Sequence, residues 1–131
     1  ELVRQCLKIG FERLVGELAG GMEAWRAAGL PEARITASRD PAALPGRVVD
    51  VRQRSEYVSG HVPDAVPIEL GSLAASPERQ GTGAVTVMCG HGERAMTGAS
   101  LLQRAGASPA VFLGGPRDWS RATGRTLASE R

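Results

Sequence analysis

From residue 34 onward, short hydrophobic runs alternate with polar stretches whose apolar positions recur at helical spacing. The runs at residues 48–51 and 85–88 are apolar without alternation, which is the pattern of strands buried on both faces of a parallel sheet. The sequence therefore predicts an α/β fold with a mostly parallel five-stranded sheet flanked by helices. We expect its strands near residues 34–37, 47–51, 66–69, 85–88 and 110–113.

The first part of the chain shows a shorter pattern of the same kind. Apolar residues at near-helical spacing over residues 1–9 predict a helix that ends at Gly10. A strand is expected over residues 14–18, and a helix containing Trp25 over residues 22–28 after a Gly-Gly turn. The pattern is thus helix, strand, glycine pair and helix.

This order of elements recurs near the end of the chain, with a helix over residues 94–105 and a strand over residues 110–113. In both copies the tryptophan, Trp25 or Trp119, lies at the same distance after a Gly-Gly pair. The first copy has only the back half of the unit. We therefore expect residues 1–31 to be the tail of a preceding, truncated repeat and residues 32–131 to form a complete domain. Residues 1–31 should pack on that domain, pack on another chain, or be partly mobile.

Composition narrows the classes of function. A chain of 131 residues with 42% hydrophobic and 23% charged residues suits a soluble globular protein. The net charge of +2 is too small to indicate nucleic-acid binding, and no apolar run could span a membrane. Fifteen of the sixteen basic residues are arginine, which we attribute to genome composition.

The two cysteines, Cys6 and Cys89, are too few for a disulfide framework, so we expect a reducing compartment, the cytoplasm. Cys6 lies in a helix-like stretch without clustered glycines, which favours simple packing. The two histidines, His61 and His91, have no metal-ligand spacing with each other or with cysteine. We therefore expect no metal and no cofactor.

The segment Val85-Thr-Val-Met-Cys-Gly-His-Gly-Glu-Arg-Ala95 carries the candidate chemistry. An apolar strand leads to Cys89, and a glycine-bearing loop then opens into a helix whose first N–H groups lack partners within the helix. Such amides, together with the positive charge of Arg94, favour a thiolate, which is the nucleophilic form of cysteine. The candidate anion-binding loop comprises Gly90, His91, Gly92, Glu93, Arg94 and Ala95.

The loop Cys89-Gly-His-Gly-Glu-Arg94 resembles the active-site loop of rhodanese domains, which are sulfurtransferases. Two further motifs support the resemblance. Val48-Val-Asp-Val-Arg52, followed by Glu56-Tyr57 and Gly60-His61-Val62-Pro63, is similar to the family's upstream signature. Val111-Phe-Leu-Gly-Gly115 with Trp119 is similar to its last strand, turn and helix. The departures are Asp64, where the family usually has glycine, and an abbreviated first strand and helix.

The resemblance implies a three-layer fold and a reaction in which Cys89 carries sulfur as a persulfide between a small-molecule donor and a thiol acceptor. The loop amides from Gly90 to Ala95 would stabilise the persulfide. Arg94 would either contact an anionic donor or brace the loop by bonding backbone carbonyls. His91 would either contact the substrate or be a solvated loop residue, and we favour the second. We expect Glu93 to be an acid that complements the first helical turn.

Away from the loop, we expect a supporting polar network of Asp50, Arg52 and Glu56, because buried charges persist only when paired. His61 should fix its turn by hydrogen bonding. Trp25 and Trp119 are expected in the core.

Three classes of function compete. The first is a working sulfurtransferase, and the second is a non-catalytic rhodanese-like module that binds or regulates. The third is a phosphatase or arsenate reductase. The loop from Cys89 to Arg94 spans six residues. That is the length typical of sulfurtransferases, whereas the phosphatases that share this fold have one residue more.

The segment of residues 10–25 is also similar to rhodanese segments found behind a metallo-β-lactamase-fold hydrolase in bacterial fusion proteins. Those fusions resemble glyoxalase II and persulfide dioxygenase. The resemblance implies that a hydrolase and its metals, where present, lie outside this chain.

Overall fold

The computed structural model describes residues 14–130, and the chain divides into two units, Glu1–Arg34 and Ile35–Arg131. The helix expected over residues 1–9 and its residue Cys6 lie outside the described residues. No described helix is long and apolar enough to cross a membrane.

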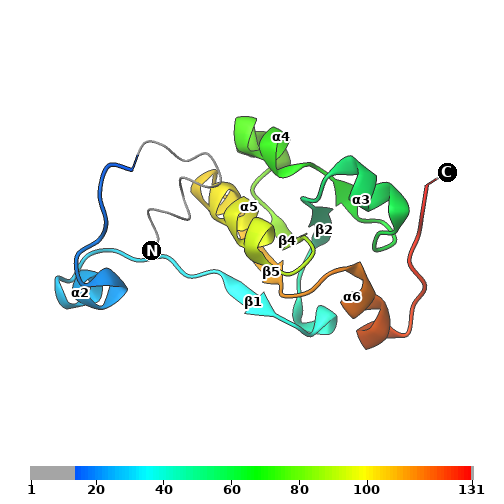
Figure 1. Ribbon diagram of the computed structural model, residues 1–131, viewed down its shortest axis with the longest axis horizontal. Helices are drawn as coiled ribbons and strands as arrows, with labels where there is room; N and C mark the ends of the chain where they lie inside the picture. The colour runs from blue at the N-terminus through cyan, green and yellow to red at the C-terminus, as the bar shows by residue number, and fades with distance from the viewer. Residues whose placement is uncertain (1–13, 131) are drawn as a thin grey trace. The chain divides into compact units, whose positions relative to one another are not determined.

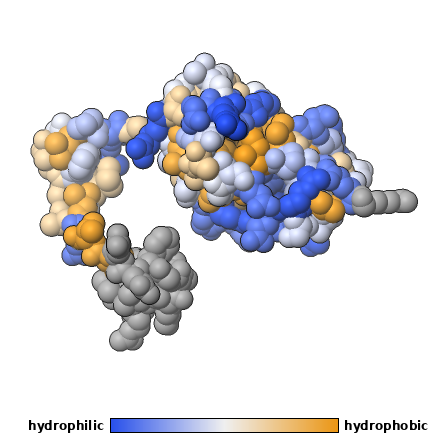
Figure 2. All heavy atoms as spheres, turned by 90° about the horizontal axis from the view of Figure 1, so that it is seen from above, coloured by the Kyte–Doolittle hydropathy of each residue, from blue (hydrophilic) through white to orange (hydrophobic). Residues whose placement is uncertain are grey.

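The first unit contains helix α2 (Gly21–Ala27), which confirms the helix expected at residues 22–28. The strand expected over residues 14–18 is wrong: Leu14, Val15 and Leu18 are exposed and irregular. A strand needs a hydrogen-bonded neighbour, and the described part of this unit has none. Hydrophobic surface is accordingly visible on the unit (Figure 2).

Trp25 does not lie in a core, contrary to expectation. Its side chain is half-buried, its indole N–H donates to the Pro31 carbonyl at 2.9 Å, and no residue of α2 is buried. Seven helical residues have too little apolar surface to enclose an indole.

The second unit is built on the predicted parallel sheet, with strand order β1-β5-β4-β2-β3 (Figure 1). All four strand pairings are parallel. Parallel pairing requires crossover connections, and these are the helical segments between the hydrophobic runs. The strands are β1 (Thr36–Ser38), β2 (Arg47–Asp50), β3 (Val66–Pro67), β4 (Ala84–Met88) and β5 (Ser108–Phe112).

Three α-helices and two short 3-10 turns connect these strands, and a fourth helix, α6, follows β5. Helix α5 crosses in front of β4 and β5 (Figure 1). The helices are α3 (Arg54–Ser59), α4 (Leu70–Ala75), α5 (Glu93–Arg104) and α6 (Pro116–Thr123), and the turns are η1 (Pro41–Ala43) and η2 (Pro77–Gln80).

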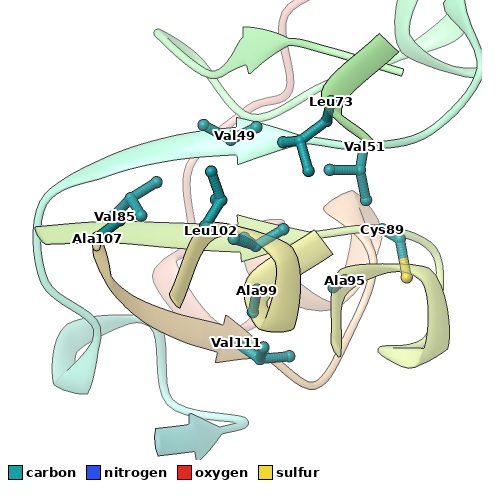
Figure 3. Packing of buried hydrophobic residues seen from close by; sticks show 11 residues of the cluster. Val49, Val51, Leu73, Val85, Cys89, Ala95, Ala99, Leu102, Ala107 and Val111 are labelled. Atoms are coloured by element: carbon teal, nitrogen blue, oxygen red, sulfur yellow. The ribbon is translucent and has the colours of Figure 1, made fainter. Parts of the chain in front are cut away.

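Alternation along the strands divides the core into two clusters. Val85, Val87 and Cys89 join the cluster that includes Ala99 and Leu102 of α5. Figure 3 shows Val85 and Cys89 beside these two helix residues. Thr86 and Met88 point away from these residues, since successive side chains of a strand face opposite sides. Met88 joins the second cluster, in which Tyr57, Phe112 and Trp119 also lie. The core position expected for Trp119 is confirmed.

Helix α5 packs closely on the sheet because it carries a glycine at its point of contact. A Cβ at Gly98 would lie 3.4 Å from methyl groups of both Val51 and Val87. This close packing fixes the height of α5 above β4, and therefore the course of the loop that joins them.

Asp64 occupies the position where the sequence comparison expected glycine, and it has φ 65°. It is the one residue other than glycine with positive φ in the described chain. Aspartate tolerates this left-handed conformation better than most residues because its short side chain can bond locally.

We expect Asp64→Val to lower the free energy of unfolding by about 1 kcal/mol, because a β-branched residue is strained at positive φ. Asp64→Gly is the matched control and should leave stability within about 0.5 kcal/mol of wild type. Urea denaturation of the three proteins measures both changes. Equal stability of the valine and glycine variants would contradict the assigned strain.

Candidate active site

Strand β4 ends at Met88 and delivers Cys89 to the loop that leads into α5. The cysteine is only 1% exposed, and its Sγ accepts a hydrogen bond from the Gly92 N–H at 3.1 Å. Figure 3 shows the sulfur pointing toward this loop. The sulfur therefore lies at the carboxyl edge of the sheet, within a turn that supplies at least one amide to it.

The shape of the loop depends on glycine. Gly92 has φ 124°, and a Cβ there would lie 3.1 Å from the Leu113 side chain. A Cβ at Gly115 would lie only 2.7 Å from the carbonyl oxygen of Gly90. The Gly-Gly turn after β5 therefore packs closely against the cysteine loop. Its sequence alone did not predict this contact.

Arg94 makes the strongest polar contact of the loop. Its two terminal nitrogens donate to the two carboxylate oxygens of Glu56 at 2.7 and 2.9 Å. Glu56 also accepts from the Gln53 N–H at 3.1 Å and so caps α3. Arg94 thus braces the loop, but through a carboxylate on α3 and not through the backbone carbonyls that the sequence suggested.

This ion pair changes the acidity of both partners. Hydrogen bonding to Arg94 lowers the pKa of Glu56 from 4.5 to about 2, against the opposing effect of partial burial. The same bond raises the pKa of Arg94 above its usual value. Both groups are therefore charged over the whole physiological range.

A second pair lies deeper. The Arg52 guanidinium donates to the Asp50 carboxylate: its Nε lies 2.9 and 3.0 Å from the two carboxylate oxygens, and its Nη2 lies 2.7 Å from Oδ2. Both side chains are at least nine-tenths buried. The remaining donors of Arg52 reach the carbonyls of Gly60 at 2.9 Å and Glu56 at 3.3 Å. Arg52 thus links Asp50 and Glu56 as the expected polar network requires, but it reaches Glu56 through the backbone carbonyl, because the Glu56 carboxylate binds Arg94.

His61 has the turn-fixing contact expected from the sequence. Its Nδ1 lies 3.0 Å from the Tyr57 carbonyl, so that nitrogen carries the proton and donates. The ring stacks on Tyr57 with centroids 3.8 Å apart. Backbone bonds between His61 and Ala128, 2.8 and 2.9 Å long, join the C-terminal segment to this turn.

The other loop residues differ in exposure. His91 and Glu93 are exposed, and Glu93 lies in the first turn of α5 as expected. Ala95 is fully buried against the sheet. Glu93 therefore faces solvent, while Ala95 anchors the helix that supplies the loop amides.

A pocket of about 390 Å³ opens beside the loop. Among the residues that line it are Gly90 and His91 of the loop, Arg117 and Arg121 of α6, and Leu127 of the C-terminal segment. The sequence did not predict that α6 and Leu127 line this pocket. Nothing in their local pattern marks them, since tertiary packing alone brings them to the loop.

Among residues 14–130, no three His, Cys, Asp or Glu side chains gather in a way that could hold a metal ion.

Comparison with known proteins places residues 35–122 within the model of the rhodanese-like domain family. A rhodanese-related protein from Thermoplasma volcanium superposes with a TM-score of 0.57 at 24% identity, covering 64% of this chain and 84% of that one. The rhodanese_3-like domain of the Alr3790 protein from Anabaena gives 0.58 at 24% identity, with coverages of 66% and 95%. Protein hp1203 from Helicobacter pylori gives 0.54 at 28% identity, with coverages of 63% and 77%. No curated protein matches the chain.

Glu56→Gln should destabilise the domain in a pH-dependent way. A carboxylate whose pKa is lowered on folding stabilises the protein at any pH above its unfolded-state pKa. This contribution is lost as the pH falls through the pKa of the folded state. The side chains of Glu56 and its partner Arg94 are each more than a third exposed. Solvent screening therefore limits the loss in unfolding free energy to about 1 kcal/mol.

The difference in unfolding free energy between wild type and Glu56→Gln should be full near neutral pH and should vanish between pH 4.5 and about 2. Urea denaturation across this range measures it, with the exposed Glu78→Gln as the control. A difference that does not change with pH would show that the ion pair contributes nothing.

Gly115→Ala should displace the cysteine loop, because the new methyl group meets the Gly90 carbonyl, which is backbone and cannot rotate away. We expect a loss of about 1–3 kcal/mol in unfolding free energy and shifted amide resonances at residues 89–95. In the control Gly71→Ala, the methyl group meets nothing within 4 Å on helix α4. Similar resonance shifts in the two variants would contradict the close contact.

Proposed function

Because this chain belongs to the rhodanese-like domain family, we propose that it is a sulfurtransferase in which Cys89 carries sulfur as a persulfide. The observation that carries the proposal is the hydrogen bond from the Gly92 N–H to the Cys89 Sγ at 3.1 Å, at the start of helix α5. A buried thiol that serves only packing does not require a loop amide directed at its sulfur.

In the first step, the Cys89 thiolate attacks the outer sulfur of a donor, either thiosulfate or a low-molecular-weight persulfide. The sulfur–sulfur bond of the donor breaks, and its electron pair leaves with sulfite or with the donor thiolate. The product is Cys89–S–S⁻. No external oxidant or reductant is needed, because the outer sulfur is transferred to Cys89 while the electron pair of the broken sulfur–sulfur bond stays with the leaving group.

In the second step, an acceptor thiolate attacks the outer sulfur of Cys89–S–S⁻. The persulfide bond breaks and its electron pair returns to Cys89 as the thiolate, so the enzyme is regenerated. Cyanide can replace the acceptor thiol in an assay and yields thiocyanate.

The chain supplies the electrostatics of both steps through its backbone. The Gly92 amide and the first amides of α5, which lack acceptors within the helix, stabilise the negative sulfur. Arg94 adds positive charge near the loop while its bond to Glu56 holds the turn in shape. We assign it a positioning role.

We also propose, from the similarity of residues 10–25 to hydrolase-linked segments, that the domain works in the cytoplasm beside a metallo-β-lactamase-fold hydrolase. The metals of such a hydrolase would have to be held by residues outside 14–130.

The proposed persulfide is tested by intact-protein mass spectrometry of the reduced chain after brief exposure to thiosulfate or glutathione persulfide. Wild type should gain one sulfur atom, which cyanide removes, and Cys89→Ser should gain none. Cys6→Ser is the matched control and should behave as wild type, because it leaves the loop cysteine in place.

If folded wild-type protein gains no sulfur from either donor, the sulfurtransferase proposal fails. A gain retained in Cys89→Ser but lost in Cys6→Ser would assign the chemistry to the wrong cysteine and would also overturn the proposal.

A further inference from the structure

We propose that Arg117 and Arg121 form a carboxylate-binding rim that selects a low-molecular-weight anionic thiol, or its persulfide, as the sulfur carrier exchanged with Cys89. This inference rests on the proposed sulfurtransferase function and names the class of substrate for the same site.

The fold brings these two arginines to the cysteine loop. Helix α6 starts directly after Gly115, where an added Cβ would come within 2.7 Å of the Gly90 carbonyl oxygen. Arg117 and Arg121 are four residues apart on this helix, so their side chains lie on one face, and both line the pocket with Gly90 and His91. A ligand held by the rim is therefore adjacent to the loop that carries the sulfur.

The other strong charges of the pocket are already paired. Arg52 is bound by Asp50, and Glu56 is bound by Arg94. The remaining charged groups of the pocket wall are the two arginines of α6 and the Asp118 carboxylate.

Asp118 neutralises this rim only in part. Its Oδ2 accepts from the Gly115 N–H at 2.9 Å, and its Oδ1 lies 3.5 Å from an Arg121 side chain that is 81% exposed. Arg117 is exposed and makes no hydrogen bond or ion pair with any residue of the described chain. The rim therefore presents a surplus of positive charge to a ligand.

The size of the pocket favours an organic ligand over a small inorganic anion. The pocket has a volume of about 390 Å³. It lies within the usual range for organic ligands, about 300–1,000 Å³. Pro116 and Leu127 supply apolar wall between the charged groups, where the methylene groups of an organic thiol can pack.

Two guanidinium groups on one helix face match a ligand with two carboxylates, because each planar fork can bond a carboxylate in bidentate geometry. Glutathione has two carboxylates and a thiol, and it is the probe we choose. Cysteamine carries a thiol and a positive charge without any carboxylate, so it is the matched comparison.

Binding is tested without turnover, by calorimetry in the Cys89→Ser background. Glutathione should bind and cysteamine should not. Arg117→Gln with Arg121→Gln should weaken glutathione binding about tenfold, since two charge-assisted contacts are lost. Arg104→Gln is the control, because it also replaces an exposed arginine by glutamine. Arg104 lies in the last turn of α5, at the end away from the loop, so this variant should leave binding unchanged.

Turnover of the otherwise wild-type enzyme gives the second readout. The double arginine variant should raise KM about tenfold for glutathione persulfide while changing KM for thiosulfate less than about twofold. Absence of glutathione binding, or equal binding by the double variant, overturns this inference even where the persulfide forms on Cys89. Arginine-dependent glutathione binding without any persulfide would support the ligand class and would instead refute the sulfurtransferase function.

Discussion

The bidentate ion pair between Arg94 and Glu56 is the contact on which the candidate site depends. It joins two segments that are 38 residues apart in sequence, the cysteine loop after β4 and helix α3 after β2. Because Glu56 also caps α3 through the Gln53 N–H, one carboxylate orders both segments. The loop thus keeps its shape while the Arg94 charge remains near the sulfur, and its amides stay directed inward.

The sheet determines where this contact forms. Parallel strands bring the ends of β2 and β4 to the same edge, so Asp50 and Cys89 leave neighbouring strands together. Alternation then directs their side chains to opposite sides: Cys89 joins the α5 side, and Asp50 is paired with Arg52. The buried pair holds the carbonyls of Glu56 and Gly60, which orients helix α3 and with it the partner of Arg94.

The pocket follows from a third contact, the close approach of Gly115 to the Gly90 carbonyl. That approach seats α6 beside the loop, so that α6 side chains form one part of the wall of the proposed substrate site. In the proposed reaction, catalytic chemistry and substrate choice would be carried by different parts of the chain. The loop amides and Cys89 would act on sulfur, whereas Arg117 and Arg121 would act on the carrier. Such a division allows a shared fold to serve different carriers by changes in α6 alone.

The sequence by itself determined the α/β class, the five parallel strands and the cysteine loop, because period, apolar runs and glycine spacing are local properties. It failed for residues 14–18, whose strand-like pattern has no neighbour in the described chain, and for Trp25, whose helix encloses no core. Tertiary structure alone decided that Glu56 binds Arg94 and that α6 lines the pocket. Partners distant in sequence meet only after the sheet order is set, and no local pattern encodes that order.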